Sequence, residues 1–135
     1  MSDWNDKIIE EFRSNDGVVG GPFKGSPLLL LHTKGRKSGR DYVHPVMYLD
    51  HDGRRFVFAS KAGAPENPQW YMNLVADPEV TVEVGTDKYE AAAAALPAEE
   101  RDRIYAVQAG LYPGFAEYQE KTSRKIPVVE ITARS

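Results

Sequence analysis

The sequence predicts a mainly β protein of the α+β class, a split β-barrel of about six mostly antiparallel strands with flanking helices. Three observations carry this prediction. Short apolar or alternating segments recur along the chain, hairpin turn signals connect several of them, and helical periodicity is confined to a few segments around them. Short strands joined by hairpins are typical of barrels and sandwiches, whereas a parallel sheet needs a helical crossover between successive strands.

The first element is a helix over residues 3–14, within an N-terminal segment of residues 1–16. Its apolar face consists of Trp4, Ile8, Ile9 and Phe12. Two interpretations are open: the helix packs on the barrel, or it serves as a lid or a weak contact with a membrane surface. Packing is favoured because the polar face is not basic, as membrane-surface helices prefer. A glycine-rich loop over 17–26 then leads to the barrel and its other helices over 27–135, and the whole chain is expected to form one domain.

The first three strands are expected over residues 27–33, 42–50 and 55–60. The first is a continuous apolar run, typical of a buried strand. The second contains Pro45, which cannot donate to a strand ladder and so indicates an edge or a bulge. Asp52-Gly53 is a strong hairpin signal between the second and third strands. In the third, Phe56 and Phe58 share one face, and Val57 and Ala59 share the other.

The second half of the chain alternates helices and strands. A helix is expected over 69–76, with Asn67 as its N-cap and Pro68 as its first helical residue. Alternating valines indicate a strand over 80–84, and the hairpin context favours a strand over 88–95 despite its five alanines. A helix opened by Pro97 should end near Gly110. Its expected apolar stripe is Ile104, Val107 and Leu111. A short helix over 114–120 and a last strand over 126–132 complete the pattern.

Composition excludes several function classes. The chain has no cysteine, which removes disulfides, thiolate nucleophiles and cysteine-ligated metals. Its net charge of -3 argues against a nucleic-acid binder. The three histidines do not form a metal-binding spacing, so no metal is predicted. No apolar run approaches the roughly 20 residues that span a bilayer, and no signal peptide is evident, so a cytoplasmic protein is expected, with membrane association through residues 3–14 as the alternative.

Two polar segments are candidates for ligand binding. Residues 34–40 carry four cations and two glycines, a combination that can hold a phosphate or carboxylate, although a solvated hairpin loop has the same composition. Residues 60–74 leave a strand through small residues and enter a helix, so that Lys61 and backbone N–H groups favour an anionic or polar ligand. The alternative is an ordinary strand-to-helix connection with Trp70 in the core.

A third feature is aromatic. Tyr105, Tyr112, Phe115 and Tyr118 lie near the end of the chain. Such residues can wall a pocket for a planar ligand and supply hydroxyl donors, or they can simply fill the core.

Together these segments resemble the deazaflavin-dependent nitroreductase family. The resemblance covers the chain from about residue 27 to its end. The matching motifs are Thr33-Lys34-Gly35-Arg36-Lys37-Ser38-Gly39, Pro45, Ser60-Lys61-Ala62-Gly63, Asn67-Pro68, Trp70-Tyr71, Asn73-Leu74, the stretch from Tyr112-Pro113 to Tyr118, and Ile126-Pro127-Val128.

The resemblance implies an FMN-binding-like split barrel that binds coenzyme F420, a reduced 8-hydroxy-5-deazaflavin, and passes hydride to a quinone or another electron-poor small molecule. Arg36 and Lys37 would hold the phosphate and the acidic tail of the cofactor. The further cofactor-binding residues it implies are Tyr42, His44, Pro45, Ser60, Lys61, Ala62, Gly63, Trp70 and Asn73. The catalytic candidates are Ser60, Tyr112 and Tyr118, with the two tyrosines and Phe115 bordering the acceptor pocket.

This chain departs from the family at three of these positions. Relatives carry arginine at the position of Tyr42, asparagine at that of His44, and, in the nitroreductase itself, tyrosine at that of Phe115. The missing hydroxyl at Phe115 should affect reduction of nitro compounds more than cofactor binding. Two other hypotheses keep the barrel: an FMN-binding oxidoreductase, whose cofactor phosphate would use the same cations, and a non-enzymatic cofactor or lipid carrier. The protein is expected to be a monomer or a dimer.

Overall fold

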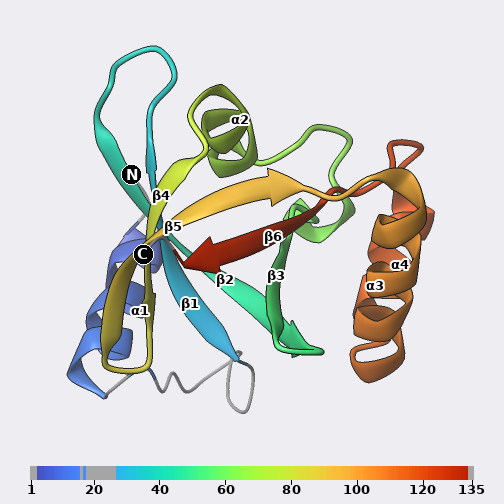
Figure 1. The fold of residues 1–135 in the computed structure, drawn as a ribbon, viewed down its shortest axis with the longest axis horizontal. Coiled ribbons are helices and arrows are strands. Elements are labelled where there is room, and N and C mark those ends of the chain that lie inside the picture. The colour runs from blue at the N-terminus through green and yellow to red at the C-terminus, as the bar shows by residue number, and fades with distance from the viewer. Residues whose placement is uncertain (1–2, 16, 18–26, 134–135) are drawn as a thin grey trace.

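The computed structural model describes residues 3–15, 17 and 27–133 and contains a closed six-stranded antiparallel barrel (Figure 1). The strands run around the barrel in the order β1-β2-β3-β6-β5-β4. Their bounds are β1 Leu28–Lys34, β2 Asp41–His51, β3 Arg54–Phe58, β4 Glu79–Val84, β5 Asp87–Ala95 and β6 Val128–Ala133. The helices are α1 Asp3–Ser14, α2 Gln69–Ala76, α3 Ala98–Leu111 and α4 Gly114–Lys121, with a 3-10 turn η2 at Lys61–Gly63. The predicted split barrel with flanking helices is confirmed.

Strand alternation divides the core between the inside and the outside of the barrel. Val57 and Ala59 point into the barrel interior, where α2 adds Trp70 and Leu74 to the strand residues. Phe56 and Phe58 point outward and pack under α3 and α4. Both faces of β3 are therefore buried, and the predicted division of its side chains between two faces is confirmed.

The alanine-rich segment is strand β5, as expected. It pairs with β4 on one side and β6 on the other. Ala91 and Ala93 point into the core, whereas Ala92, Ala94 and Ala95 are exposed. Two flanking strands satisfy the backbone of this segment, and this tertiary pairing overrides the helix propensity of alanine.

Helix α1 packs on the outer face of β1 and β2. Ile8 and Phe12 are buried there with Leu28 and Leu30. An ion pair adds to this contact, because Arg13 binds both carboxylate oxygens of Glu83 on β4, at 3.1 and 2.7 Å. Packing is thus the interpretation that the described residues support. No helix in the described ranges is long and apolar enough to cross a membrane.

Several local predictions need correction. The residue that caps α2 is Pro68 in extended conformation, with no side-chain cap, while Asn67 accepts a hydrogen bond from Arg124 instead. Helix α3 continues through Gly110 and ends at Leu111. The residue that ends it is Tyr112, which is in extended conformation, so no glycine is used. Strand β3 stops at Phe58, where the chain turns into η2.

The expected apolar stripe of α3 is also partly wrong. Ile104 is buried, but Leu111 is 59% exposed. The side chains that join Ile104 on the buried face are Arg101, Tyr105 and Gln108. Long polar side chains can cover apolar surface when their polar ends find partners, and hydropathy patterns do not register this.

Candidate functional site

Strand pairing is interrupted between the first half of β2 and the end of β3. Strand β2 pairs with β3 only at its C-terminal end, and the last pair joins Tyr48 to Val57. Beyond this pair β3 continues along β6, where Phe58 pairs with Val128. Residues 41–47 of β2 pair with β1 alone. The two segments diverge in Figure 1, and we call the gap in pairing the β2–β3 opening.

Pro45 lies on the β2 side of this opening. The backbone N–H of Tyr48 donates to the carbonyl of Pro27, on the β1 side, at 3.2 Å. Because peptide groups alternate along a strand, the peptide of Pro45 points away from β1 and toward the opening. No ladder hydrogen bond is required there, so proline fits. The predicted edge position of Pro45 is confirmed.

His44 contributes a buried polar atom next to Pro45. It pairs with Leu31, a residue of the barrel interior. Its Nδ1 atom is buried and has no hydrogen-bond partner in the described part of the chain. Burial lowers the pKa of His44, because the charged imidazolium is poorly solvated there. At neutral pH the ring is therefore uncharged, with one donor and one acceptor nitrogen, and Nδ1 is available to a bound ligand.

The basic turn, residues 34–40, joins β1 to β2 and carries Lys34, Arg36, Lys37 and Arg40. The turn closes through hydrogen bonds from Gly35 N to Arg40 O and from Gly39 N to Gly35 O, at 2.7 and 2.8 Å. Gly35 is needed for close packing, since a Cβ atom there would lie 2.7 Å from the ring of Tyr42. Lys37 is exposed, and none of the described residues pairs with its ammonium group.

Asn73 fixes the basic turn to α2. Its Oδ1 atom accepts hydrogen bonds from the backbone N and the Nη1 of Arg36, at 3.3 and 3.1 Å, and its Nδ2 donates to Thr33 Oγ1 at 3.2 Å. Gln69 adds a second acceptor for Arg36 Nη1 at 2.9 Å. Asn73 is 4% exposed and engaged at both ends of its amide, so it orients Arg36.

Residues 60–63 form the other side of the opening and have an unusual backbone. Ser60 is in right-handed helical conformation, but Lys61 has a φ of 45° and Gly63 a φ of 81°. A non-glycine residue in the left-handed region is strained, and residues of this kind are concentrated at functional sites. Lys61 pairs with Glu66, five residues later in the chain, with 2.9 Å between Nζ and Oε1. Ala62 lies in the same 3-10 turn.

The α4 helix packs closely on this segment. A Cβ atom at Gly63 would lie 2.8 Å from the carbonyl oxygen of Tyr118. Phe115 is buried against Phe58 and Tyr105, with ring centroids 5.6 and 6.4 Å apart. The rings of Tyr112 and Tyr118 contact Phe115 edge-on, at 6.5 and 5.2 Å, and both tyrosines are half-buried. Phe115 is thus core, and the two tyrosines form its partly exposed rim.

Most of the predicted site residues gather around the β2–β3 opening. Tyr42, His44 and Pro45 belong to its β2 side, residues 60–63 to its β3 side, and the basic turn to the end of the barrel at which β1 finishes. Trp70 differs, because its side chain is 6% exposed and packs inside the barrel. It supports α2 from within, and its assigned contact with the cofactor stays a prediction.

Arg124 is a site residue that the sequence analysis missed. Its guanidinium donates hydrogen bonds to the carbonyls of Ala59, Ser60 and Ala64 and to Oδ1 of Asn67, at 2.8 to 3.2 Å. The residue thus ties the segment after β3 to the segment before β6. Nothing local distinguishes it from Lys125, which follows it and is exposed, so only the long-range contact reveals its place.

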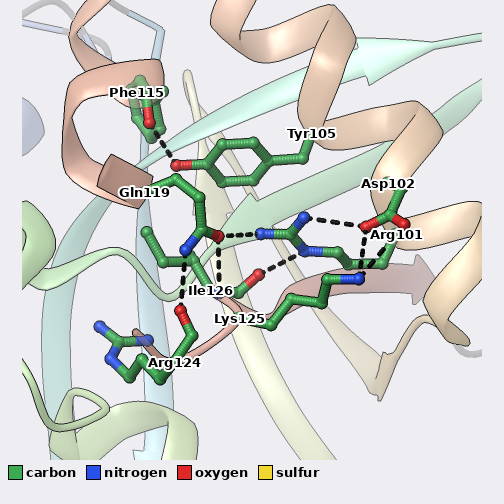
Figure 2. A network of polar contacts seen from close by, with 8 residues as sticks. All are labelled: Arg101, Asp102, Tyr105, Phe115, Gln119, Arg124, Lys125 and Ile126. Carbon is green, nitrogen blue, oxygen red and sulfur yellow. Dashed lines mark hydrogen bonds and ion pairs between the residues drawn. The ribbon is translucent and has the colours of Figure 1, made fainter. Parts of the chain in front are cut away.

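A buried polar network holds Arg124 in turn (Figure 2). Gln119 donates from Nε2 to the backbone carbonyl of Arg124 at 2.8 Å and accepts a hydrogen bond from Arg101. Arg101 also donates to the carbonyl of Ile126 at 2.8 Å and stacks over the ring of Tyr105. The hydroxyl of Tyr105 donates to the carbonyl of Phe115 at 2.5 Å. The loop between α4 and β6 is therefore anchored from both helices.

The comparisons with known proteins agree on one family. The family model described as F420H(2)-dependent quinone reductase matches residues 4–133. An F420H(2)-dependent quinone reductase of Mycobacterium tuberculosis (strain ATCC 25618 / H37Rv) is 35% identical over 129 residues, which are 91% of this chain and 85% of that protein.

Solved structures give the same result. The structure of an F420-H2 dependent reductase, FDR-A, has a TM-score of 0.70 and 39% identity over 78% of this chain and 93% of that one. A structure described as a domain-swapped dimer has a TM-score of 0.72 and 36% identity over 93% of this chain and 92% of that one. The likeness extends through sequence and fold. The chain belongs to the F420H(2)-dependent quinone reductase family.

Proposed function

We propose that this protein is an oxidoreductase that binds reduced coenzyme F420 at the β2–β3 opening and reduces a quinone. One observation carries the proposal: pairing of β2 with β3 stops at Tyr48, which leaves the peptide edge of Pro45 unpaired on that side, and Lys37 in the turn before β2 has no partner among the described residues. Family membership supports the same cofactor and the same acceptor class.

The residues present fit such a cofactor. An anionic tail needs cations that are not neutralised by the protein, and Lys37 is one. A planar ring with polar edges needs donors and acceptors beside a flat apolar surface. The Nδ1 of His44, which has no partner in the described part of the chain, and the strand edge at Pro45 supply the polar groups, and the partly buried side chains of Val46 and Tyr48 on the same strand supply apolar surface.

When bound, reduced coenzyme F420 supplies a hydride. The protein contributes binding, orientation and exclusion of water. Arg36 and Lys37 hold the tail, with Arg36 oriented by Asn73 and Gln69. Residues 60–63 and His44 orient the ring from the two sides of the opening. The half-buried tyrosines Tyr112 and Tyr118 border the acceptor.

Reduction of a quinone to a hydroquinone consumes a hydride and a proton. In the proposal, the hydroxyl groups of Ser60, Tyr112 and Tyr118 donate hydrogen bonds to the acceptor oxygens on which negative charge develops. Phe115 is buried and offers no such hydroxyl. The chain therefore has donors for quinone oxygens at the rim of its aromatic cluster rather than in its centre.

The first test is binding, followed by turnover. Purified protein is titrated with oxidised coenzyme F420 and with FMN by intrinsic tryptophan fluorescence. Reduced coenzyme F420 is then mixed with a soluble quinone, and its oxidation is followed by absorbance. We expect binding of the deazaflavin, no comparable binding of FMN, and oxidation only when protein and quinone are both present.

Lys37→Ala is the matched variant for the basic turn, and Lys7→Ala on α1 is its control, because both remove one exposed cation. Loss of a charged contact to the cofactor should weaken its affinity by about tenfold in Lys37→Ala alone. Equal affinity in the two variants would show that the turn does not contact the cofactor. Selective binding of FMN would place the protein on the flavin side of the fold, and binding without turnover would indicate a carrier.

A further inference from the structure

Arg124 binds the segment after β3 entirely from its carbonyl side. Its Nη2 donates to Ser60 O at 3.0 Å, its Nη1 to Ala59 O at 3.2 Å, and its Nε to Ala64 O at 3.0 Å. The fourth hydrogen bond runs from Nη1 to Oδ1 of Asn67 at 2.8 Å. Guanidinium groups have donors in a rigid fork, and here that fork spans both ends of one turn.

These contacts determine where the N–H groups of the turn point. Ser60 is right-handed and Lys61 left-handed in backbone conformation, and this sequence of conformations makes successive N–H groups converge on one concave side. The carbonyls of Ala59 and Ser60 face Arg124. Among the residues that the structure describes, none accepts a hydrogen bond from the N–H groups of Ser60 or Lys61. Two donors are therefore left for a ligand oxygen.

The strain at Lys61 explains why such a clamp is needed. A lysine at a φ of 45° costs free energy relative to the right-handed form, and the conformation persists only if surrounding contacts fix it. The ion pair of Lys61 with Glu66 is exposed and contributes little. The hydrogen bonds of Arg124 are partly buried, and hydrogen bonds from a charged donor are stronger than neutral ones.

Arg124 is itself held in a fixed position. Its backbone carbonyl accepts from Gln119, which is bound by Arg101 from α3 (Figure 2). Burial lowers the pKa of Arg124 from its ordinary value. The lowered pKa is still far above neutral pH, so the guanidinium stays charged. A partly buried charge held by four acceptors, on a loop between α4 and β6, indicates a specific task for this residue.

We propose that Arg124 is a positioning residue for cofactor binding: it holds residues 59–67 by their carbonyl groups, so that the N–H groups of Ser60 and Lys61 are presented to an oxygen atom of the bound cofactor. This inference rests on the proposed function for the identity of the ligand. The conformation of residues 59–67 does not depend on the identity of the ligand. Conformation and cofactor binding are therefore tested separately.

The variants are Arg124→Ala, which removes the clamp, and Arg124→Lys, which keeps the charge but lacks the planar fork. Arg54→Ala is the matched control. Arg54 also makes several hydrogen bonds, to Glu100 and Glu130, but it lies at the other end of β3 from Ser60. Any effect that merely follows from loss of a networked arginine should appear in the control as well.

The conformation is tested first, without cofactor, by amide hydrogen exchange. We expect exchange of residues 59–67 to become at least about tenfold faster in Arg124→Ala and faster in Arg124→Lys, with wild-type exchange of this segment in Arg54→Ala. Unchanged exchange in both Arg124 variants would overturn the proposal. Arg124→Lys keeps this test decisive if Arg124→Ala does not fold.

Affinity is tested next, by fluorescence titration with oxidised coenzyme F420. We expect the Kd to rise by about tenfold or more in both Arg124 variants, and millimolar guanidinium to restore part of the affinity of Arg124→Ala, whereas ammonium should not. Wild-type affinity in the variants would overturn the role in binding. If the wild-type protein binds no coenzyme F420, the proposed function fails, and the exchange experiment still decides whether Arg124 fixes the segment.

Discussion

Gly63 shows how a single missing side chain lets two elements meet. The residue has a φ of 81°, and a Cβ atom would lie 2.8 Å from the carbonyl oxygen of Tyr118 and 3.0 Å from Lys121 Cβ on α4. Both constraints disfavour any larger residue. The sequence motif that contains Gly63 thus serves close contact between the 3-10 turn and α4 as well as a turn conformation.

Replacement of Gly63 by alanine should therefore cost more than backbone conformation alone. Gly53→Ala is the control, because Gly53 has a φ of 75° but no atom within 4 Å of its Cβ position. We expect Gly53→Ala to lower the free energy of unfolding by about 1–2 kcal/mol. Gly63→Ala should lower it by roughly 1–3 kcal/mol more, because α4 must move. Urea unfolding measures both, and equal losses would mean that the contact with α4 relaxes without cost.

Buried polar side chains are the second feature at this scale. Asn73 is 4% exposed and has its amide engaged at both ends, by Arg36 and by Thr33. The side-chain amide of Gln108 and Nδ1 of His44 are buried without hydrogen bonds to the described residues. Asn73 is explained by its structural role, whereas His44 faces the barrel interior beside the opening. For Gln108 the contacts offer no explanation.

At the scale of elements, strand register creates the site. Strands β2 and β3 pair over four residues and then part, because β3 follows β6 and the chain turns at Lys61. The unpaired half of β2 would be an aggregation-prone edge in an open sheet. Here Pro45 removes one donor, and α1 covers the outer face at Val43 and Met47.

The ion pair between Arg13 on α1 and Glu83 on β4 should be sensitive to acid. Glu83 on β4 accepts from Arg13 on α1 and pairs with His32 on β1 at 2.5 Å, and its register partner on β5 is Lys88. The hydrogen bonds from Arg13 lower the pKa of Glu83 from its ordinary 4.5 to about 2. A depressed carboxyl pKa adds stability that is complete above the ordinary value and is lost as pH falls toward the depressed one.

Glu83→Gln tests this ion pair. The variant should be less stable than the wild type at neutral pH, and the difference should shrink as pH falls from about 4.5 toward 2, where wild-type Glu83 is protonated as well. Urea unfolding at a series of pH values measures the difference. Glu90→Gln on β5 is the control, since Glu90 is exposed. A difference that stays constant through this pH range would contradict the assignment.

For the molecule as a whole, charge is unevenly distributed. The net charge is -3, yet residues 34–40 carry four cations and no acid. Such a local excess attracts an anionic ligand over a distance set by the ionic strength, with a Debye length of about 10 Å at 0.1 M salt. Affinity for coenzyme F420 should therefore depend on salt.

We expect the Kd for coenzyme F420 to rise by about tenfold between 0.05 and 0.5 M sodium chloride, with the on-rate changing more than the off-rate. Stopped-flow fluorescence separates the two rates. Lys37→Ala should show a weaker dependence on salt than Lys7→Ala. An affinity that does not change with salt would mean that the cofactor tail is not bound by the basic turn.

Much of the fold and of the site follows from local sequence. Alternation predicts that Phe56 and Phe58 share one face of a strand and Val57 the other, as the structure shows, and the turn at Asp52-Gly53 joins this strand to β2 as expected. The basic turn, Pro45 and residues 60–63 are recognised from residue types and from the family resemblance. The errors concern residues whose surroundings are distant in sequence: Leu111 is exposed, and Asn67 binds Arg124 instead of capping α2.

The sequence by itself determined where the strands, helices and turns lie, because each depends on neighbours a few positions away. Only the tertiary structure decided the order of strands around the barrel, the opening between β2 and β3, and the place of Arg124. Arg124 and Ser60 are 64 positions apart, and their contact exists only because β6 returns beside β3. Hydrogen bonds of this kind depend on the closed barrel, and local propensities carry no record of them.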